Sequence, residues 1–284
     1  MIDQTDHTPL FCDIALAARI ERAEAELITE WNAATRRRLG DAAGFAITIA
    51  GGVASYAEPD SPINKIAGLG FADPPDPADL DAVERAFADH GAPVQAEVAS
   101  LADPALLELL AQRAYRLVSF EDVLGRALAD PVDRVAPPGI DVRPSGDDEF
   151  AAWVDLVVDA SLHPDTQGVP WHEEFPREIL ENAERDTVGL VHRYLATLDG
   201  VAAGGASMRI TDGIAQLTGA ATAPAFRRRG IQSALLAARL SDAAAAGTDV
   251  AVITVQPGSK SQHNALRRGF TLLYTRAVLV KAGS

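Results

Sequence analysis

The sequence repeats itself at a constant spacing. Residues 114–124, AYRLVSFEDVL, align with residues 269–279, GFTLLYTRAVL, which lie 155 positions later. At the same spacing PVQAEV (93–98) aligns with TDVAVI (248–253), and an amphipathic helical pattern that ends at a glycine precedes both. A match between several segments at one spacing indicates an internal duplication. The chain is therefore expected to fold as two related halves.

We place the boundary between the halves before the PPG linker, so that the first domain spans residues 1–136 and the second spans 137–284. In the second half, Asp-Gly pairs close two strand-like runs, a pattern typical of β-hairpins. Residues 214–222 are predicted to form one strand, and the Ala-rich run from Gly230 to Ala246 a helix. This order of elements predicts the α/β class, with a mixed, mostly antiparallel sheet flanked by helices in each half.

Composition excludes several classes of protein. Apolar residues make up 48 % and charged residues 23 % of the chain, which is typical of globular proteins and not of disordered or fibrous ones. No apolar run approaches the roughly 18 residues of a membrane helix, and the first residues lack the layout of a signal peptide. The single cysteine, Cys12, excludes an internal disulfide, and no Cys/His cluster has metal-ligand spacing. We expect a cytoplasmic protein that binds neither a metal nor a membrane.

Charge is distributed unevenly along the chain, whose formal net charge is −15. Residues 1–136 carry a net charge of −12, whereas residues 187–284 carry +7. A net acidic chain is a poor candidate for nucleic-acid binding, which depends on neutralising many phosphates. A local positive field on an acidic body suits a small polyanion better, although charge also varies between segments by chance.

Two triple-arginine clusters lie in different helical contexts. TRRRLG at 35–40 comes at the end of a predicted helix, where cations favour the helix dipole and Gly40 can form a cap. PAFRRRGIQ at 224–232 lies between a predicted strand and the start of a helix. The first turn of a helix offers free N–H groups and a partial positive charge, and this combination binds phosphate. The first cluster is therefore predicted to be structural and the second an anion site.

The second cluster also matches a known motif. TAPAFRRRGIQ resembles the acetyl-CoA signature V-x-P-x-x-[RQ]-x-x-G-x-[GA] of the GNAT acetyltransferases. The matching positions are Thr222, Pro224, Arg227 and Gly230. The motif departs at Gln232, which stands where glycine or alanine is usual.

A later segment strengthens the resemblance. NALRRGF (264–270) is similar to the end of the family's last helix, where a Gly-Phe pair opens the final strand. The resemblance covers roughly residues 140–281, and the internal repeat extends it to the first half. The chain is identified as a pair of tandem GNAT-like domains, of which the second carries the acetyl-CoA motif.

The resemblance implies acetyl-CoA as the cosubstrate. The loop from Arg227 to Ser233 would hold the pyrophosphate through backbone N–H groups. The strand around 220–222 would separate from its neighbour and bind the pantetheine arm and the acetyl carbonyl, polarising the thioester for attack by an amine. The implied cofactor-binding residues are Ala220, Ala221, Thr222, Arg227, Arg228, Arg229, Gly230, Ile231, Gln232, Ser233 and Asn264.

The family's usual acid and base are not found at their positions. Many members place a tyrosine four residues before the Gly-Phe pair, and this position is Ala265. Tyr274 is the candidate replacement, with a role in the core as the alternative. Where some members carry a glutamate base, the strand 214–222 offers Gln216 and Thr218. Other candidate bases lie in the polar loop at 163–176, namely His163, Asp165, His172, Glu173 and Glu174, whereas His192 is expected to be a sheet residue.

The first half is expected to have lost the cofactor site. At the 155-residue spacing, RRRGIQ (227–232) corresponds to ADPPDP (72–77). Prolines lack N–H donors and aspartates repel phosphate, so this segment cannot cradle a phosphate. The remaining roles are to complete the sheet, to wall the acceptor pocket or to mediate a homodimer. Its net charge of −12 would also attract a cationic amine.

Three functions follow from these features. The first is an acetyl-CoA-dependent N-acetyltransferase that moves an acetyl group to a primary amine of a small molecule or peptide. The second is a catalytically silent CoA-binding regulator or sensor, which the missing acid and base favour. The third is a protein whose halves serve interaction only, and it leaves unexplained why an arginine cluster lies at a strand–turn–helix junction. The first is therefore our prediction.

Overall fold

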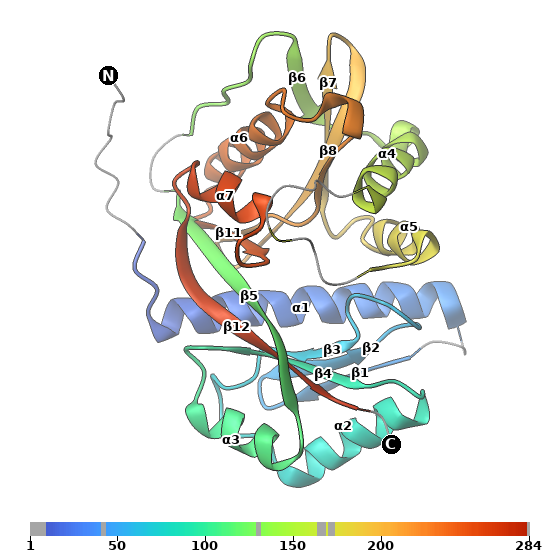
Figure 1. The fold of residues 1–284 in the computed structure, drawn as a ribbon, viewed down its shortest axis with the longest axis vertical. Helices are drawn as coiled ribbons and strands as arrows, with labels where there is room; N and C mark the ends of the chain where they lie inside the picture. Colours follow the sequence, from blue (N-terminus) through green and yellow to red (C-terminus); the bar gives the residue numbers. More distant parts are fainter. Residues whose placement is uncertain (1–9, 41–43, 129–131, 164–168, 170–173, 283–284) are drawn as a thin grey trace. The chain divides into compact units, whose positions relative to one another are not determined.

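The chain mixes helices with strands throughout its length (Figure 1). The computed structural model describes residues 10–40, 44–128, 132–163, 169 and 174–282. By their contacts the residues fall into two units, each assembled from three stretches of chain. Unit 1 comprises residues 1–12, 122–172 and 191–273, and unit 2 comprises residues 13–121, 173–190 and 274–284.

Unit 2 is a mixed sheet packed with helices. Its helices are α1 (Ile14–Leu39), α2 (Pro77–Asp89), α3 (Pro104–Gln112) and α5 (Arg177–Asp186). Its strands are β1 (Phe45–Ile49), β2 (Gly52–Tyr56), β3 (Lys65–Ala67), β4 (Val94–Ala99) and the parts of β5 (Arg116–Ala127) and β12 (Thr271–Lys281) that fall within the unit. The order β1-β2-β3-β4-β12 has β3 parallel to β4 and its other pairs antiparallel.

The first arginine cluster ends α1, as predicted. Gly40 caps the helix with a φ of 59°, and its N–H donates to Arg36 O. Arg38 donates two hydrogen bonds to Asp186 of α5, from Nε to Oδ1 at 2.9 Å and from Nη2 to Oδ2 at 2.8 Å. Thr35 Oγ1 donates to the same carboxylate at 2.8 Å. The predicted structural role is confirmed, because the cluster joins α1 to α5.

Charged side chains from α1 and four strands meet in the interior of unit 2. Arg276 of β12 donates from Nε to Glu21 at 2.8 Å. Its Nη1 lies 3.7 Å from Glu97 and 3.9 Å from Glu121. Lys65 donates to Glu97 at 2.9 Å. Acids outnumber cations in this cluster, and burial together with the charge of Glu97 raises the pKa of Glu121 to about 7.

Replacing Glu121 by glutamine is expected to remove a pH dependence of stability. Because the pKa of Glu121 is raised from 4.5 to about 7, folding takes up a proton at intermediate pH, and the free energy of unfolding falls as pH rises across this interval. Between about pH 5 and pH 8, the free energy of unfolding of the wild type should fall by at least about 1 kcal/mol relative to that of Glu121→Gln. Urea unfolding at both pH values measures the difference, with the exposed Glu108→Gln as control. Parallel profiles for wild type and Glu121→Gln would contradict it.

Unit 1 contains a second mixed sheet. Its helices are α4 (Phe150–Leu162), α6 (Ile231–Ala245) and α7 (Lys260–Leu266). Its strands are β6 (Ile140–Pro144), β7 (His192–Leu198), β8 (Val201–Thr211), β9 (Ile214–Gln216), β10 (Ala220–Thr222), β11 (Val250–Val255) and the remaining parts of β5 and β12. The order is β5-β11-β9-β8-β7-β6, with β11 parallel to β9 and the other pairs antiparallel. Helices α4 and α6 both pack on β8 (Figure 1), so the predicted mixed α/β class is confirmed.

The sequence repeat is also a structural repeat. Moved forward by 155 residues, β3, α2, β4, α3 and β5 fall on β10, α6, β11, α7 and β12, and their bounds agree to within one residue. The internal duplication is therefore confirmed element by element. One expectation within it is wrong, because residues 214–222 do not form a single strand. Strand β9 ends at Gln216, and β10 begins at Ala220 after a break.

The final strands of the two repeats are exchanged. β5 ends the first repeat but pairs with β11 of the second, in a register that sets Val250 against Ala127. β12 ends the second repeat but pairs with β4 of the first, setting Arg276 against Ala99. Of the three roles left open for the first half, completing a sheet is the one that the β5–β11 pairing supports. The predicted domains, 1–136 and 137–284, follow the repeat along the chain, whereas the units defined by contacts do not.

Candidate cofactor site

Two neighbouring strands of unit 1 separate after a short common stretch. β9 pairs with β11 as far as Gln216 and Val252, and Leu217 N still donates to Val252 O at 2.9 Å. The chain leaves β11 at residues 217–219. Beyond this break, β10 lies off the path of the sheet and pairs with β8. The predicted separation of residues 220–222 from the neighbouring strand is thereby confirmed.

The corresponding strand of the first repeat stays within its sheet. β3 pairs with β2 and, through Ile66 and Ala96, with β4. Lys65 of β3 also forms an ion pair with Glu97 of β4 at 2.9 Å. Strands β3 and β4 therefore remain together where β10 and β11 separate.

The start of α6 is open, whereas the start of α2 is closed. The N-cap of α6 is Gly230, so no side chain caps the helix, and its first turn holds no acidic residue. The N-cap of α2 is Asp76, whose carboxylate accepts from Ala78 N at 2.8 Å, and the following Pro77 has no N–H. Of the two helix starts, that of α6 presents uncapped N–H groups and the positive end of the helix dipole to an anion.

The turn before α6 uses left-handed backbone at two positions, with φ of 62° at Arg228 and 95° at Gly230. A Cβ added at Gly230 would lie 2.7 Å from Cγ of Pro137, so both conformation and space require glycine there. Gln232 Nε2 donates to Ala220 O at 3.1 Å. The residue that departs from the family motif thus ties the first turn of α6 to β10.

The three arginines of this turn have different surroundings. Arg227 is half-buried, and its Nη2 donates to Ala160 O at 3.3 Å and to His163 O, both at the end of α4. Its Nε donates to Thr222 O at 3.3 Å. Arg228 and Arg229 are exposed. The side chain of Arg227 is therefore engaged with backbone carbonyls, and its two neighbours are the cations that face solvent.

A pocket of about 280 Å³ lies beside the first turn of α6. It is lined by Ser233, Lys260, His263, Asn264, Arg267 and Arg268. Lys260, His263 and Arg267 follow one face of α7. Within the part of the chain that the structure describes, no carboxylate pairs with Lys260, Arg267 or Arg268. Cations gathered without counter-charges favour an anionic ligand.

One more arginine, on the neighbouring strand β5, contacts a residue of this pocket. Arg126 of β5 donates from Nη1 to Arg268 O at 2.8 Å. Burial and the charge of Arg268 lower the pKa of Arg126. Of the pocket residues, Ser233 and Asn264 are predicted from the sequence, whereas the basic side chains are not. Their spacing of three and four along a predicted helix was the signal that pointed to them.

The remaining predicted cofactor residues offer mostly backbone groups. Ala220 is exposed, whereas Ala221, Thr222 and Ile231 are buried. Thr222 Oγ1 is buried without a hydrogen-bond partner among the described residues. A buried hydroxyl without a partner is uncommon and suits a polar ligand atom.

The predicted catalytic residue, Tyr274, lies in the core of unit 2. Its side chain is 3 % exposed, and its hydroxyl donates to Glu21 Oε1 at 2.7 Å within the charged cluster described above. Residues from 274 onward belong to unit 2 because β12 pairs with β4. Tyr274 therefore takes the core role that the sequence left as the alternative, and we assign it no part in the chemistry.

The other candidate acids and bases are more dispersed. Gln216 is buried and accepts from Arg209 Nη1 at 3.0 Å, and Thr218 Oγ1 lies 2.9 Å from Ser207 Oγ. His192 begins β7 and is exposed. The exposed residues His163 and Glu174 flank the polar loop. Asp165, His172 and Glu173 lie outside the described residues. In the described parts of the chain no group of His, Cys, Asp and Glu side chains could hold a metal ion.

Tyr274→Phe is expected to lower stability without slowing the acetyl transfer that the sequence motif implies. The substitution removes a buried hydrogen bond to a carboxylate, which contributes about 1.5–3 kcal/mol. Thermal unfolding should shift down while the rate of CoA thiol release in the presence of amines stays unchanged. A loss of turnover of about a hundredfold, with intact acetyl-CoA binding, would instead restore Tyr274 as the acid.

The comparisons with known proteins agree with this geometry. The sequence profile of the acetyltransferase (GNAT) family matches residues 143–270, somewhat less than half of the chain, and these residues are similar to that family. The matched range includes the separated strand, the arginine turn and the cationic pocket. No curated protein matches the sequence.

Solved structures extend the likeness to both repeats. A GCN5-related N-acetyltransferase from Kribbella flavida is similar over 95 % of this chain and 96 % of its own, with a TM-score of 0.67 and 22 % identity. A tandem GNAT protein from the clavulanic acid biosynthesis pathway is similar over 73 % and 69 %, with a TM-score of 0.54 and 14 % identity. At these identities the likeness shows a shared tandem GNAT fold. No helix among the described residues has the length and apolar character to cross a membrane.

Proposed function

We propose that the protein is an acetyl-CoA-dependent N-acetyltransferase that acts on a primary amine of a small molecule or peptide. The observation that carries this proposal is a cationic surface in two parts at the uncapped start of α6, namely the exposed Arg228 and Arg229 and the basic pocket beside the first turn. Ser233 belongs to the first turn of that helix and also lines the pocket with Lys260, Arg267 and Arg268. CoA carries a pyrophosphate and a separate phosphate monoester, and the two halves of this surface suit such a polyanion.

The separated strand β10 is the proposed binding site of the thioester arm. β10 lies next to the first turn of α6, since Gln232 bonds to Ala220 O. Backbone groups of β10 that have left β11 can bind the amides of the pantetheine arm and the acetyl carbonyl. Polarisation of that carbonyl stabilises the oxyanion that forms when a neutral amine attacks. The new C–N bond forms and the C–S bond breaks. The attacking nitrogen gives up one proton to water or to a base of the acceptor, and the leaving thiolate takes up one proton from solvent to become the thiol of CoA.

A catalytically silent CoA sensor is the second candidate. It is favoured by the position of the family's tyrosine, Ala265, which is 1 % exposed and carries no acid. Binding without turnover on a panel of primary amines would identify the sensor. Turnover that increases with the concentration of one amine would identify the transferase.

Calorimetric titration with acetyl-CoA tests the proposed cofactor directly. One site per chain is expected, because the start of α6 is open and Asp76 closes the start of α2. Two sites would show that the first repeat also binds the cofactor. No heat of binding, with no competition from CoA in a thermal-shift assay, would remove acetyl-CoA from the proposal.

A further inference from the structure

A fully buried arginine lies beneath the separated strands of unit 1. Arg239 of α6 is 2 % exposed, and Nη1 donates to Ser207 O at 3.0 Å and to Thr218 O at 3.1 Å. Its Nε donates to Leu235 O at 3.3 Å. The acceptors are all backbone carbonyls, and no carboxylate among the described residues pairs with it. Burial lowers the pKa of Arg239 to about 10, so it stays charged at neutral pH. A buried charge without a counter-ion lowers the stability of the fold, so a functional explanation for Arg239 is sought in the groups that it contacts.

The carbonyl that Arg239 holds lies in the break between β9 and β10. Thr218 is the middle residue of that break. Ser207 of β8 also bonds to the break, since its N–H donates to Gly219 O at 3.0 Å and to Thr218 O at 3.4 Å. The break is therefore held from β8 on one side and from α6 on the other. Arg239 supplies the bond from α6 to Thr218 O.

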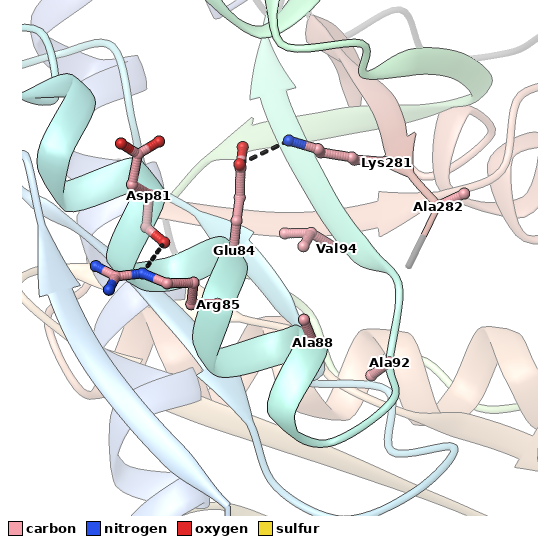
Figure 2. A pocket seen from close by; sticks show the side chains of 8 residues that line it. All are labelled: Asp81, Glu84, Arg85, Ala88, Ala92, Val94, Lys281 and Ala282. Atoms are coloured by element: carbon pink, nitrogen blue, oxygen red, sulfur yellow. Dashed lines mark hydrogen bonds and ion pairs between the residues drawn. The ribbon is translucent and has the colours of Figure 1, made fainter. Parts of the chain in front are cut away.

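The first repeat provides an internal comparison. At the spacing of 155 residues, Arg239 corresponds to Glu84 of α2. Glu84 lines a surface pocket of about 510 Å³, where it accepts from Lys281 Nζ at 2.6 Å (Figure 2). Glu84 also accepts from Arg113 Nη2 at 2.9 Å. Helix α2 thus carries an acid where α6 carries Arg239, and β3 remains paired with β4. The repeat that lacks the arginine is the one whose strands have not separated.

We propose that Arg239 is a positioning residue that keeps β10 apart from β11 so that the arm of a CoA thioester can bind. This inference rests on the proposed function and adds a residue to it. By bonding Thr218 O, Arg239 fixes where the chain leaves β11. Because the same helix begins at Gly230, α6 fixes both the phosphate end and the thioester end of the site. Arg239 itself need not touch the ligand.

Dissecting the ligand tests the proposal. Acetyl-CoA is compared with 3′-phosphoadenosine 5′-diphosphate, which keeps the phosphates and lacks the arm. Arg239→Met should weaken acetyl-CoA binding by about tenfold or more and leave the nucleotide affinity unchanged. Arg239→Lys, which keeps one donor and the charge, should restore part of the loss. The control is Arg134→Met, which removes a surface ion pair to Asp242 of α6.

Hydrogen exchange of the free protein gives a readout that needs no ligand. Arg239→Met should speed exchange of the amides at 217–222 by about tenfold, and Arg134→Met should not. Equal loss of both ligands would show general damage to α6 and overturn the proposal, as would unchanged acetyl-CoA binding. If the wild type binds neither ligand, the proposed function fails. In that case hydrogen exchange is the remaining test of Arg239. Exchange rates at 217–222 that are the same in Arg239→Met and the wild type would overturn its positioning role.

Discussion

Reversing the charge of Arg228 and Arg229 together is expected to weaken acetyl-CoA binding by at least about a hundredfold. Both side chains are exposed in the turn that leads into the uncapped start of α6. Each reversal replaces attraction by repulsion beside the proposed pyrophosphate site, and one hydrogen bond to a charged group contributes about 1.5–3 kcal/mol. Calorimetry on the Arg228→Glu/Arg229→Glu variant measures the loss. Arg227 is left intact because it bonds the carbonyls at the end of α4.

The chain offers a matched control in its other arginine cluster. Arg36→Glu/Arg37→Glu makes the same change in net charge at exposed positions in the last turn of α1. This variant should bind acetyl-CoA as the wild type does. Circular dichroism and thermal unfolding report whether either pair disturbs the fold. If both pairs weaken binding equally, the cause is the overall charge, and the α6 turn is not the phosphate site.

The isolated second repeat, residues 137–284, is expected not to fold. Its strand β11 would lose β5, which pairs with it from Asp122 to Ala127. A row of backbone N–H and C=O groups would be left unpaired, and the fully buried Leu124 would be missing from the core. The fragment should aggregate or show an unfolded circular dichroism spectrum, and it should not bind acetyl-CoA.

Co-expression of the two repeats as separate chains provides the control. Residues 1–136 and 137–284 should copurify as a complex, because each supplies the last strand of a sheet in which the other takes part. This complex should bind acetyl-CoA. A soluble 137–284 that binds acetyl-CoA alone would contradict the prediction and would show that β12 can take the place of β5 beside β11.

Much of the fold could be predicted from the sequence, because the individual elements of each repeat are specified by short segments. Helix α6, its glycine cap and the Gly269-Phe270 opening of β12 each follow from a few neighbouring residues, and the repeat predicts equivalent elements in the first half. The exchange of β5 and β12 does not follow, because periodicity shows that a strand exists and not which strand it joins. The break at 217–219 was missed for the same reason, since each side of it is strand-like.

The candidate site was predicted unevenly. The motif located the turn around Gly230, because a glycine before an apolar helix and after a strand has a definite geometry. Spacing could not show that Arg227 bonds backward to α4, or that Tyr274 reaches Glu21, more than 200 residues earlier in the chain. Arg239 lies in an ordinary Ala/Leu helical pattern, where arginine is usually an exposed residue. These assignments depend on contacts between distant segments.

The exchanged strands also constrain how the protein is made. Residues 276–281 of β12 pair with residues 94–99 of β4, so the sheet of unit 2 cannot close until residues 276–281 have left the ribosome. Until then β4 presents an unpaired edge to other nascent chains. Pairing across such long stretches of chain also slows folding. A chaperone that binds extended apolar segments would have its longest opportunity during the synthesis of the second repeat.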